Sequence, residues 1–196
     1  MELKSYQKEV IADLARYLEL VVELQSPSKA YQALWSENNV MVGLGGMPAY
    51  VNDLPGVPHV CAKVPTGGGK TFIAASAVNT IFSAVPQRRA KALVWLVPSD
   101  AILTQTRKAL ENPAHPYRQR LDRDFGGRVQ VYSKEQALMG QNLNPSAVME
   151  QLSVFVLSYD SFRTSKKEGR KAYQENGYLA DFYQVDGRPI GFAGRH

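Results

Sequence analysis

Residues 64–71 read Val64-Pro65-Thr66-Gly67-Gly68-Gly69-Lys70-Thr71, and this stretch decides which fold the sequence predicts. An apolar segment at residues 59–64 leads into it, and a segment of good helix formers follows at residues 71–78. A strand, a glycine-rich turn and a helix in this order are the setting that a phosphate-binding loop requires. We therefore expect an α/β domain of the P-loop NTPase class, in which a strand runs into a nucleotide site.

The residue types of this loop match the chemistry of phosphate binding. Glycine reaches backbone angles that other residues avoid, so the successive N–H groups of residues 67–69 can turn toward phosphate oxygens. The helix that follows directs its positive dipole end at the same oxygens. Lys70 adds a full charge for the β- and γ-phosphates of ATP, and the Thr71 hydroxyl is placed to ligate Mg²⁺. The predicted nucleotide-binding residues of the loop are Pro65, Thr66, Gly67, Gly68, Gly69, Lys70 and Thr71, with Lys70 and Thr71 in the catalytic roles.

One departure from the general motif leaves an alternative open. Val64 stands where the pattern G-x-x-x-x-G-K-[ST] has its first glycine. A glycine-rich turn between a strand and a helix that ends in Lys-Thr by chance would read in the same way.

Composition narrows the class of protein. The chain has 196 residues, 44% of them hydrophobic and 21% charged, which is typical of a globular domain with a real core. A formal charge of +5 suits a polyanionic partner, although it is also common in proteins that bind no nucleic acid. Cys61 is the single cysteine, so no disulfide is expected, and its apolar setting predicts a buried side chain. His59 and His115 lack partners at metal-ligand spacing and are interpreted as structural.

The sequence also gives an expectation about location. The N-terminus has no apolar signal core, and no apolar run approaches the roughly 18 residues that a membrane span needs. We therefore expect a cytoplasmic protein that does not associate with membranes.

Hydrophobic periodicity predicts an alternation of helices and strands. Helices are expected at residues 5–24, 30–36 and 70–84, and a further one from Ser99 or Asp100 to Glu111. Strands are expected at residues 59–64, 92–97, 128–132 and 154–158. This order favours a parallel sheet with flanking helices. The predicted regions are 1–58, a helix and a connecting segment, 59–170, the nucleotide-binding core, and 171–196, a tail of unassigned structure.

Together these residues resemble the front half of a superfamily 2 helicase motor, which has a RecA-like fold. The resemblance is closest to the restriction subunit of type III restriction enzymes and to related DEAD/DEAH helicases. The loop form Thr66-Gly67-x-Gly69-Lys70-Thr71 is the one seen in that group, and Ser5-Tyr6-Gln7 resembles its short N-terminal motif. The resemblance implies that Gln7 reads the adenine edge, which a carboxamide can do with one acceptor and two donors. Taken alone, Gln7 would be interpreted as a solvated helix residue.

Two later segments resemble parts of the nucleic-acid track of these motors. Residues 96–105 are similar to motif Ia, and residues 156–162 resemble a later segment at a strand end, while residues 112–118 resemble the type III group itself. The resemblance implies that nucleic acid contacts Pro98, Ser99, Gln105, Ser158 and Tyr159, and it favours duplex DNA while leaving RNA as the alternative. Seven basic and three acidic residues lie between Thr104 and Lys134, and five basic residues against one acid lie at residues 163–171. The alternative for such charge runs is a solvated face.

The expected acidic motif for catalysis does not occur. A helicase motor uses an Asp-Glu pair to hold Mg²⁺ and polarise water, and the chain contains no Asp-Glu dipeptide; Asp160 is a weak substitute. The resemblance implies that this pair follows residue 170, so we expect an incomplete first motor domain from a truncated product. The main hypothesis is the ATP-binding portion of a DNA translocase, an ATP hydrolase in the intact enzyme, with a modification methyltransferase as candidate partner. The alternatives are a nucleotide-binding module that does not hydrolyse ATP and a small P-loop kinase.

Overall fold

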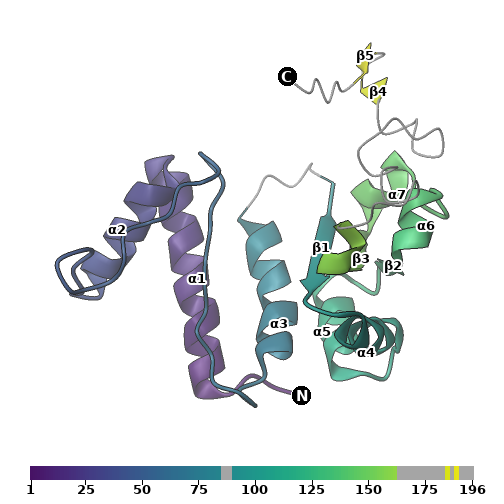
Figure 1. Cartoon of the computed structure of the whole chain (residues 1–196), viewed down its shortest axis with the longest axis horizontal. Helices are drawn as coiled ribbons and strands as arrows, with labels where there is room; N and C mark the ends of the chain where they lie inside the picture. Colours follow the sequence, from purple (N-terminus) through teal and green to yellow (C-terminus); the bar gives the residue numbers. More distant parts are fainter. Residues whose placement is uncertain (85–89, 163–183, 186–187, 190–196) are drawn as a thin grey trace. The chain divides into compact units, whose positions relative to one another are not determined.

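The computed structural model describes residues 1–84, 90–162, 184–185 and 188–189 (Figure 1). The chain divides into two compact units, of which unit 1 is Met1–Gln87 and unit 2 is Arg88–His196. The 64–71 loop falls in unit 1 with the N-terminal helices, so this division differs from the boundary expected at residue 58. The charged segment 163–171 lies outside the described residues, as does the 171–196 tail apart from two short strands.

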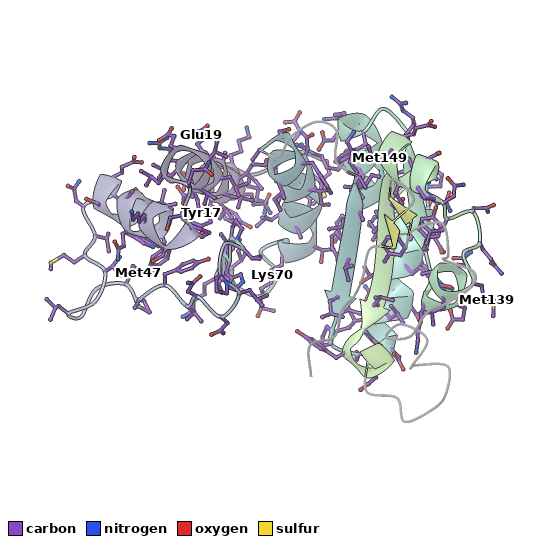
Figure 2. The ribbon with its side chains drawn as sticks, turned by 90° about the horizontal axis from the view of Figure 1, so that it is seen from above. Tyr17, Glu19, Met47, Lys70, Met139 and Met149 are labelled. Carbon is purple, nitrogen blue, oxygen red and sulfur yellow. The ribbon has the colours of Figure 1, made fainter. Side chains whose placement is uncertain are left out.

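Unit 1 is built around α1. Its helices are α1 (Ser5–Leu24), α2 (Pro27–Glu37) and α3 (Lys70–Ser83). The helices expected in this part of the chain are therefore confirmed. Helix α1 contacts both α2 and α3, and the buried side chains of Tyr17, Leu20 and Ala30 hold α1 against α2. Tyr17 is labelled in Figure 2. In α3, Phe72, Ile73 and other apolar residues are buried, which fixes the helix that leaves the 64–71 loop.

The strand expected at residues 59–64 does not form. Residues 57–65 have no helix or strand, and the His59 N–H donates to the Tyr50 hydroxyl (3.0 Å) instead of to a neighbouring strand. Val60 is 60% exposed and Cys61 is also exposed, so the prediction of a buried Cys61 is wrong. The apolar sequence permits an extended backbone here, but a strand also requires backbone bonds to a partner strand.

Unit 2 contains a parallel sheet. The strands β1 (Ala92–Val97), β2 (Val129–Tyr132) and β3 (Leu152–Ser158) lie in the order β1-β3-β2, with both pairs parallel (Figure 1). The register aligns Val97 with Ser158 and Tyr132 with Phe155. These three strands and their parallel pairing were expected from the sequence and are confirmed. A separate antiparallel pair is formed by β4 (Gln184–Val185) and β5 (Arg188–Pro189).

Helices connect the parallel strands of unit 2 and pack on the sheet, and a 3₁₀ helix follows β3. They are α4 (Asp100–Glu111), α5 (Pro116–Asp124), α6 (Lys134–Leu138), α7 (Pro145–Glu150) and the 3₁₀ helix η1 (Tyr159–Phe162). Helix α4 begins where expected, because the Ser99 hydroxyl accepts the Ile102 N–H (3.5 Å). It contacts all three strands, and Leu110 of α4 and Leu121 of α5 are fully buried.

The outer strand β1 is less buried than its apolar sequence predicts. Val94 is 57% exposed and Leu96 is 40% exposed, whereas Val154 and Val156 of the central strand β3 are fully buried. The two exposed side chains share one face of β1, since alternate residues of a strand point to the same side. Position in the sheet explains the difference, because β3 has a neighbouring strand on each side and β1 has β3 alone among the described residues.

Arg118 joins three elements of unit 2. Its guanidinium donates to the Leu110 carbonyl at the end of α4 (3.2 Å) and to the Val129 carbonyl of β2 (3.0 Å). It also pairs with Asp122 one turn along α5 (2.8 Å), and the Arg118 side chain is only 17% exposed. The rigid fork of a guanidinium can reach several acceptors at once. One side chain therefore ties α5 to both α4 and β2.

Candidate phosphate-binding loop and sheet edge

The 64–71 loop adopts the backbone that its glycines predict. Gly67 and Gly69 have φ angles of 76° and 71°, in the left-handed region that side chains avoid. Gly68 needs to be glycine for a different reason, because a Cβ there would lie 2.6 Å from Val64 Cγ1 and 2.9 Å from the Pro65 carbonyl oxygen. The loop closes through the Gly68 N–H, which donates to that Pro65 oxygen (3.0 Å). Its tight shape thus depends on all three glycines.

Helix α3 starts directly at the end of the loop. Gly69 is the N-cap residue, and its carbonyl accepts the N–H groups of Phe72 (2.9 Å) and Ile73 (3.0 Å). The N–H groups of the first turn have no acceptor within a helix, and they carry the positive end of the helix dipole. A phosphate group bound over Gly69 and Lys70 would face this end.

The two predicted catalytic residues occupy the first turn of α3. The Lys70 ammonium folds back and donates to the Pro65 carbonyl (3.0 Å), so its charge lies over the loop (Figure 2). An ammonium carries three protons, and this bond uses one of them. The next residue, Thr71, is half-buried. Loop, helix start and Lys70 together fit the phosphates of a nucleotide, and the hydroxyl type of Thr71 fits a Mg²⁺ ligand.

The start of α1 reaches the same loop. The Tyr6 hydroxyl donates to the Gly68 carbonyl (2.7 Å), and Gln7 Nε2 donates to the same oxygen (3.0 Å). Gln7 is only 3% exposed, and its Oε1 accepts the Lys4 N–H (2.9 Å). The structure thus brings Gln7 to the loop across 61 positions of sequence. An adenine contact stays a prediction, and it would replace a bond that Nε2 makes in this structure.

Tyr6 is the residue of this site that sequence reasoning missed. It lies beside Gln7 in the resembling motif, but nothing in the local pattern indicates a partner 62 residues away. A tyrosine at the first turn of an amphipathic helix is usually interpreted as an apolar residue at the edge of the core.

Four of the five predicted nucleic-acid residues lie at the carboxyl end of the sheet in unit 2, and the fifth, Gln105, lies in the middle of α4. Pro98 and Ser99 follow β1, and Ser158 and Tyr159 end β3 and begin η1. Parallel pairing of β1 with β3 places these strand ends side by side. The Ser158 hydroxyl also donates to Asp100 Oδ1 (2.8 Å), which joins the two segments.

Exposure distinguishes the members of this group. Pro98, Gln105 and Tyr159 are exposed and Ser99 is half-buried, whereas Ser158 is only 1% exposed. Three of the nearby basic residues already pair with the local acids, in the ion pairs Arg107–Glu111, Arg118–Asp122 and Arg120–Asp124. The excess of positive charge in this region therefore rests on the other basic residues.

The described residues contain no cluster of His, Cys, Asp and Glu suited to a metal ion. The two histidines of the described residues contact neighbouring side chains and backbone. His59 stacks on Tyr50, and His115 Nδ1 accepts the Tyr117 N–H at the start of α5 (3.3 Å). Within the described ranges, each helix is also too short or too polar to cross a bilayer.

A family model agrees with this arrangement. The model described as ResIII, type III restriction enzyme, res subunit, matches residues 1–183. The chain belongs to this family. The family has a P-loop NTPase-like fold with an N-terminal domain like that of DEAD/DEAH helicases, in agreement with the parallel sheet of unit 2 and with the resemblance noted from the sequence. No match was found among curated proteins or among solved structures.

Proposed function

We propose that this chain binds ATP with Mg²⁺ through the 64–71 loop, as the ATP-binding portion of a DNA translocase of the type III restriction class. Membership of the family implies a helicase-like ATP-binding module. The observation that carries the proposal is the loop itself, in which left-handed Gly67 and Gly69 lead into α3 and Lys70 lies over the turn. This combination of glycine backbone, helix N-terminus and ammonium is suited to a chain of phosphates.

Each residue has a separate task in the proposed site. The N–H groups of residue 67 and of residues 69–71 bind phosphate oxygens, whereas the Gly68 N–H keeps its bond to the Pro65 carbonyl. The ammonium of Lys70 exchanges the Pro65 carbonyl for the β- and γ-phosphates, where its full charge counts most. The Thr71 hydroxyl holds Mg²⁺, which neutralises phosphate charge during transfer. Gln7 is the candidate for adenine recognition, from its place beside the loop.

We further propose that duplex DNA binds at the carboxyl end of the unit 2 sheet. The candidate contacts are the exposed or half-buried residues Pro98, Ser99, Gln105 and Tyr159. The N-terminus of α4 supports this role, since free N–H groups at a helix start bind backbone phosphates. Ser158 is buried, and its bond to Asp100 links the end of β3 to the start of α4. A modification methyltransferase is the partner subunit that the family suggests.

Replacing Lys70 tests the nucleotide site. Lys70→Ala removes the ammonium, so we expect the dissociation constant for Mg-ATP to rise by about 10- to 150-fold, as the loss of a charge-assisted contact of about 1.5–3 kcal/mol implies. Lys29→Ala is the matched control, because Lys29 is exposed on α2, away from the loop in sequence. Titration calorimetry measures binding, and circular dichroism checks that both variants fold. Wild-type affinity in Lys70→Ala would refute the assigned site.

A second candidate is a module that binds ATP without hydrolysing it. The observation in its favour is the absence of an Asp-Glu dipeptide from the sequence. Mg-ATP turnover by the purified chain, with and without duplex DNA, separates the two functions. Turnover that DNA stimulates and that Lys70→Ala abolishes supports the translocase, whereas tight binding without turnover supports the binding module.

A further inference from the structure

The Gly68 carbonyl is held from outside the loop by two side chains of α1. Tyr6 Oη donates to it at 2.7 Å and Gln7 Nε2 at 3.0 Å. Gln7 Nε2 also donates to the Tyr6 oxygen (3.3 Å), so the three groups form a closed set. All of them belong to unit 1. The shortest of the three bonds is made by Tyr6, which the proposed nucleotide site does not otherwise use.

The direction of this carbonyl determines where a neighbouring donor points. A peptide bond is planar and trans, so the C=O of Gly68 and the N–H of Gly69 point in opposite directions. Fixing the carbonyl toward α1 therefore fixes the Gly69 N–H away from α1. Gly69 is the N-cap residue of α3, and its N–H is among the donors that a bound phosphate would use.

The Gly68–Gly69 peptide needs such a constraint more than other peptides. Neither residue has a Cβ, so rotation of the peptide plane between them meets little steric resistance. The Gly68 N–H already donates to the Pro65 carbonyl (3.0 Å), which fixes the Gly67–Gly68 peptide. The orientation of the Gly68–Gly69 peptide depends instead on the contacts that its carbonyl makes. Those contacts come from Tyr6 and Gln7.

We propose that Tyr6 is a positioning residue of the phosphate site. Its hydroxyl holds the Gly68 carbonyl so that the Gly69 N–H stays aimed at the nucleotide phosphates, and Tyr6 contacts no part of the nucleotide base. The proposal rests on the proposed function, because it concerns the same loop. It predicts an effect on the phosphate chain that does not depend on which base is attached.

The test compares two tyrosines that make the same type of bond. Tyr6→Phe removes the bond to Gly68, and the matched control Tyr31→Phe removes the bond that the Tyr31 hydroxyl donates to the Pro48 carbonyl (2.9 Å). Loss of one neutral hydrogen bond implies a weakening of about two- to tenfold. We expect Tyr6→Phe to raise the dissociation constants for ATP, GTP and inorganic triphosphate by the same factor. Tyr31→Phe should change none of them.

A spectroscopic readout separates positioning from general loosening. In wild-type protein, inorganic triphosphate should shift the amide resonance of Gly69 in a ¹⁵N–¹H spectrum. In Tyr6→Phe, that shift at saturation should shrink, while the resonances of α2 keep their wild-type positions. The proposal is overturned if Tyr6→Phe binds triphosphate as tightly as the wild type, if only ATP is weakened, or if Tyr31→Phe has the same effect.

The Lys70→Ala variant separates failure of the role of Tyr6 from failure of the proposed nucleotide site. If wild-type protein binds triphosphate, Lys70→Ala does not, and Tyr6→Phe is unchanged, then the role of Tyr6 is wrong and the proposed function stands. If wild-type protein binds no triphosphate, the proposed function fails and the role of Tyr6 fails with it.

Discussion

The 64–71 loop and the carboxyl end of the sheet are held in place by different means. The loop has no strand leading into it, and its shape depends on hydrogen bonds that Tyr6, Gln7 and Lys70 make to loop carbonyls. The sheet end is fixed by strand register, with Val97 beside Ser158. A loop of glycines can change its backbone at small cost in stability, whereas a sheet edge cannot move without disturbing its core. Substitutions in the loop should therefore change the affinity for ATP. Substitutions at residues that hold the helices and strands of unit 2 together should change the free energy of unfolding.

The largest effect is expected from replacing Arg118, the side chain that ties α5 to α4 and β2. Arg118→Ala leaves the Leu110 and Val129 carbonyls without this donor and removes the pair with Asp122. Unsatisfied buried acceptors cost about 1–3 kcal/mol each, so the free energy of unfolding should fall by about 3 kcal/mol. Urea denaturation measures it through Trp95 of β1, in a background where Trp35, the other tryptophan, is replaced by Phe.

A neighbouring arginine provides the control for that experiment. Arg120 pairs with Asp124 at the same spacing on α5 and at the same distance of 2.8 Å. Its hydrogen bond to that carboxylate stays within the helix, so Arg120→Ala should cost only about 0.5–1 kcal/mol. Equal losses for the two variants would contradict the view that Arg118 acts through its two carbonyl contacts.

The sequence predicts what depends on local pattern. The helical period of α1, the glycine–lysine loop and the Ser99 cap are local features, and each lies where it was expected. The parallel pairing of β1 and β3 also follows, since helices between apolar strands favour it. These features depend on neighbouring residues in the chain, so a single sequence contains the information.

The features that were missed depend on distant partners. Residues 59–64 and 92–97 are similar apolar runs, but only the second pairs with another strand in the structure. The partner of the Tyr6 hydroxyl lies 62 residues away, and no spacing rule links the two positions. Burial of Ser158 likewise depends on packing at the sheet end rather than on its own polarity. Such contacts are set by the tertiary fold, which a local pattern does not encode.

A smaller effect is expected in the 64–71 loop, where the substitution should change ATP affinity more than stability. Gly68→Ala places a methyl group against Val64 Cγ1 and the Pro65 carbonyl, so the backbone of the loop must shift. We expect the dissociation constant for Mg-ATP to rise by about tenfold, equivalent to about 1.4 kcal/mol. The free energy of unfolding should change by less than about 1 kcal/mol, because the loop can move without uncovering the core. Titration calorimetry and urea denaturation give the two values.

The control for Gly68 is a glycine outside the loop. Gly56 has a φ angle of 79° and open space around it, so Gly56→Ala introduces backbone strain without a clash. It should lower stability by about 1 kcal/mol and leave ATP affinity unchanged. The contrast between the 64–71 loop and the helices and strands of unit 2 is contradicted if Gly68→Ala unfolds the protein. The loop would then be part of what stabilises unit 1.

The smallest effect should come from the Ser158–Asp100 hydrogen bond at the sheet end. If strand register holds this edge, the bond adds only about 1 kcal/mol to the free energy of unfolding. A double-mutant cycle with Ser158→Ala and Asp100→Ala isolates the bond, because the single variants also change burial and the first turn of α4. Coupling well above that value in Trp95 fluorescence would mean that side-chain bonds hold this edge too, as they hold the 64–71 loop. Coupling near zero would leave register as its sole support, and the predicted DNA contacts at Pro98 and Tyr159 would then keep their positions in both single variants.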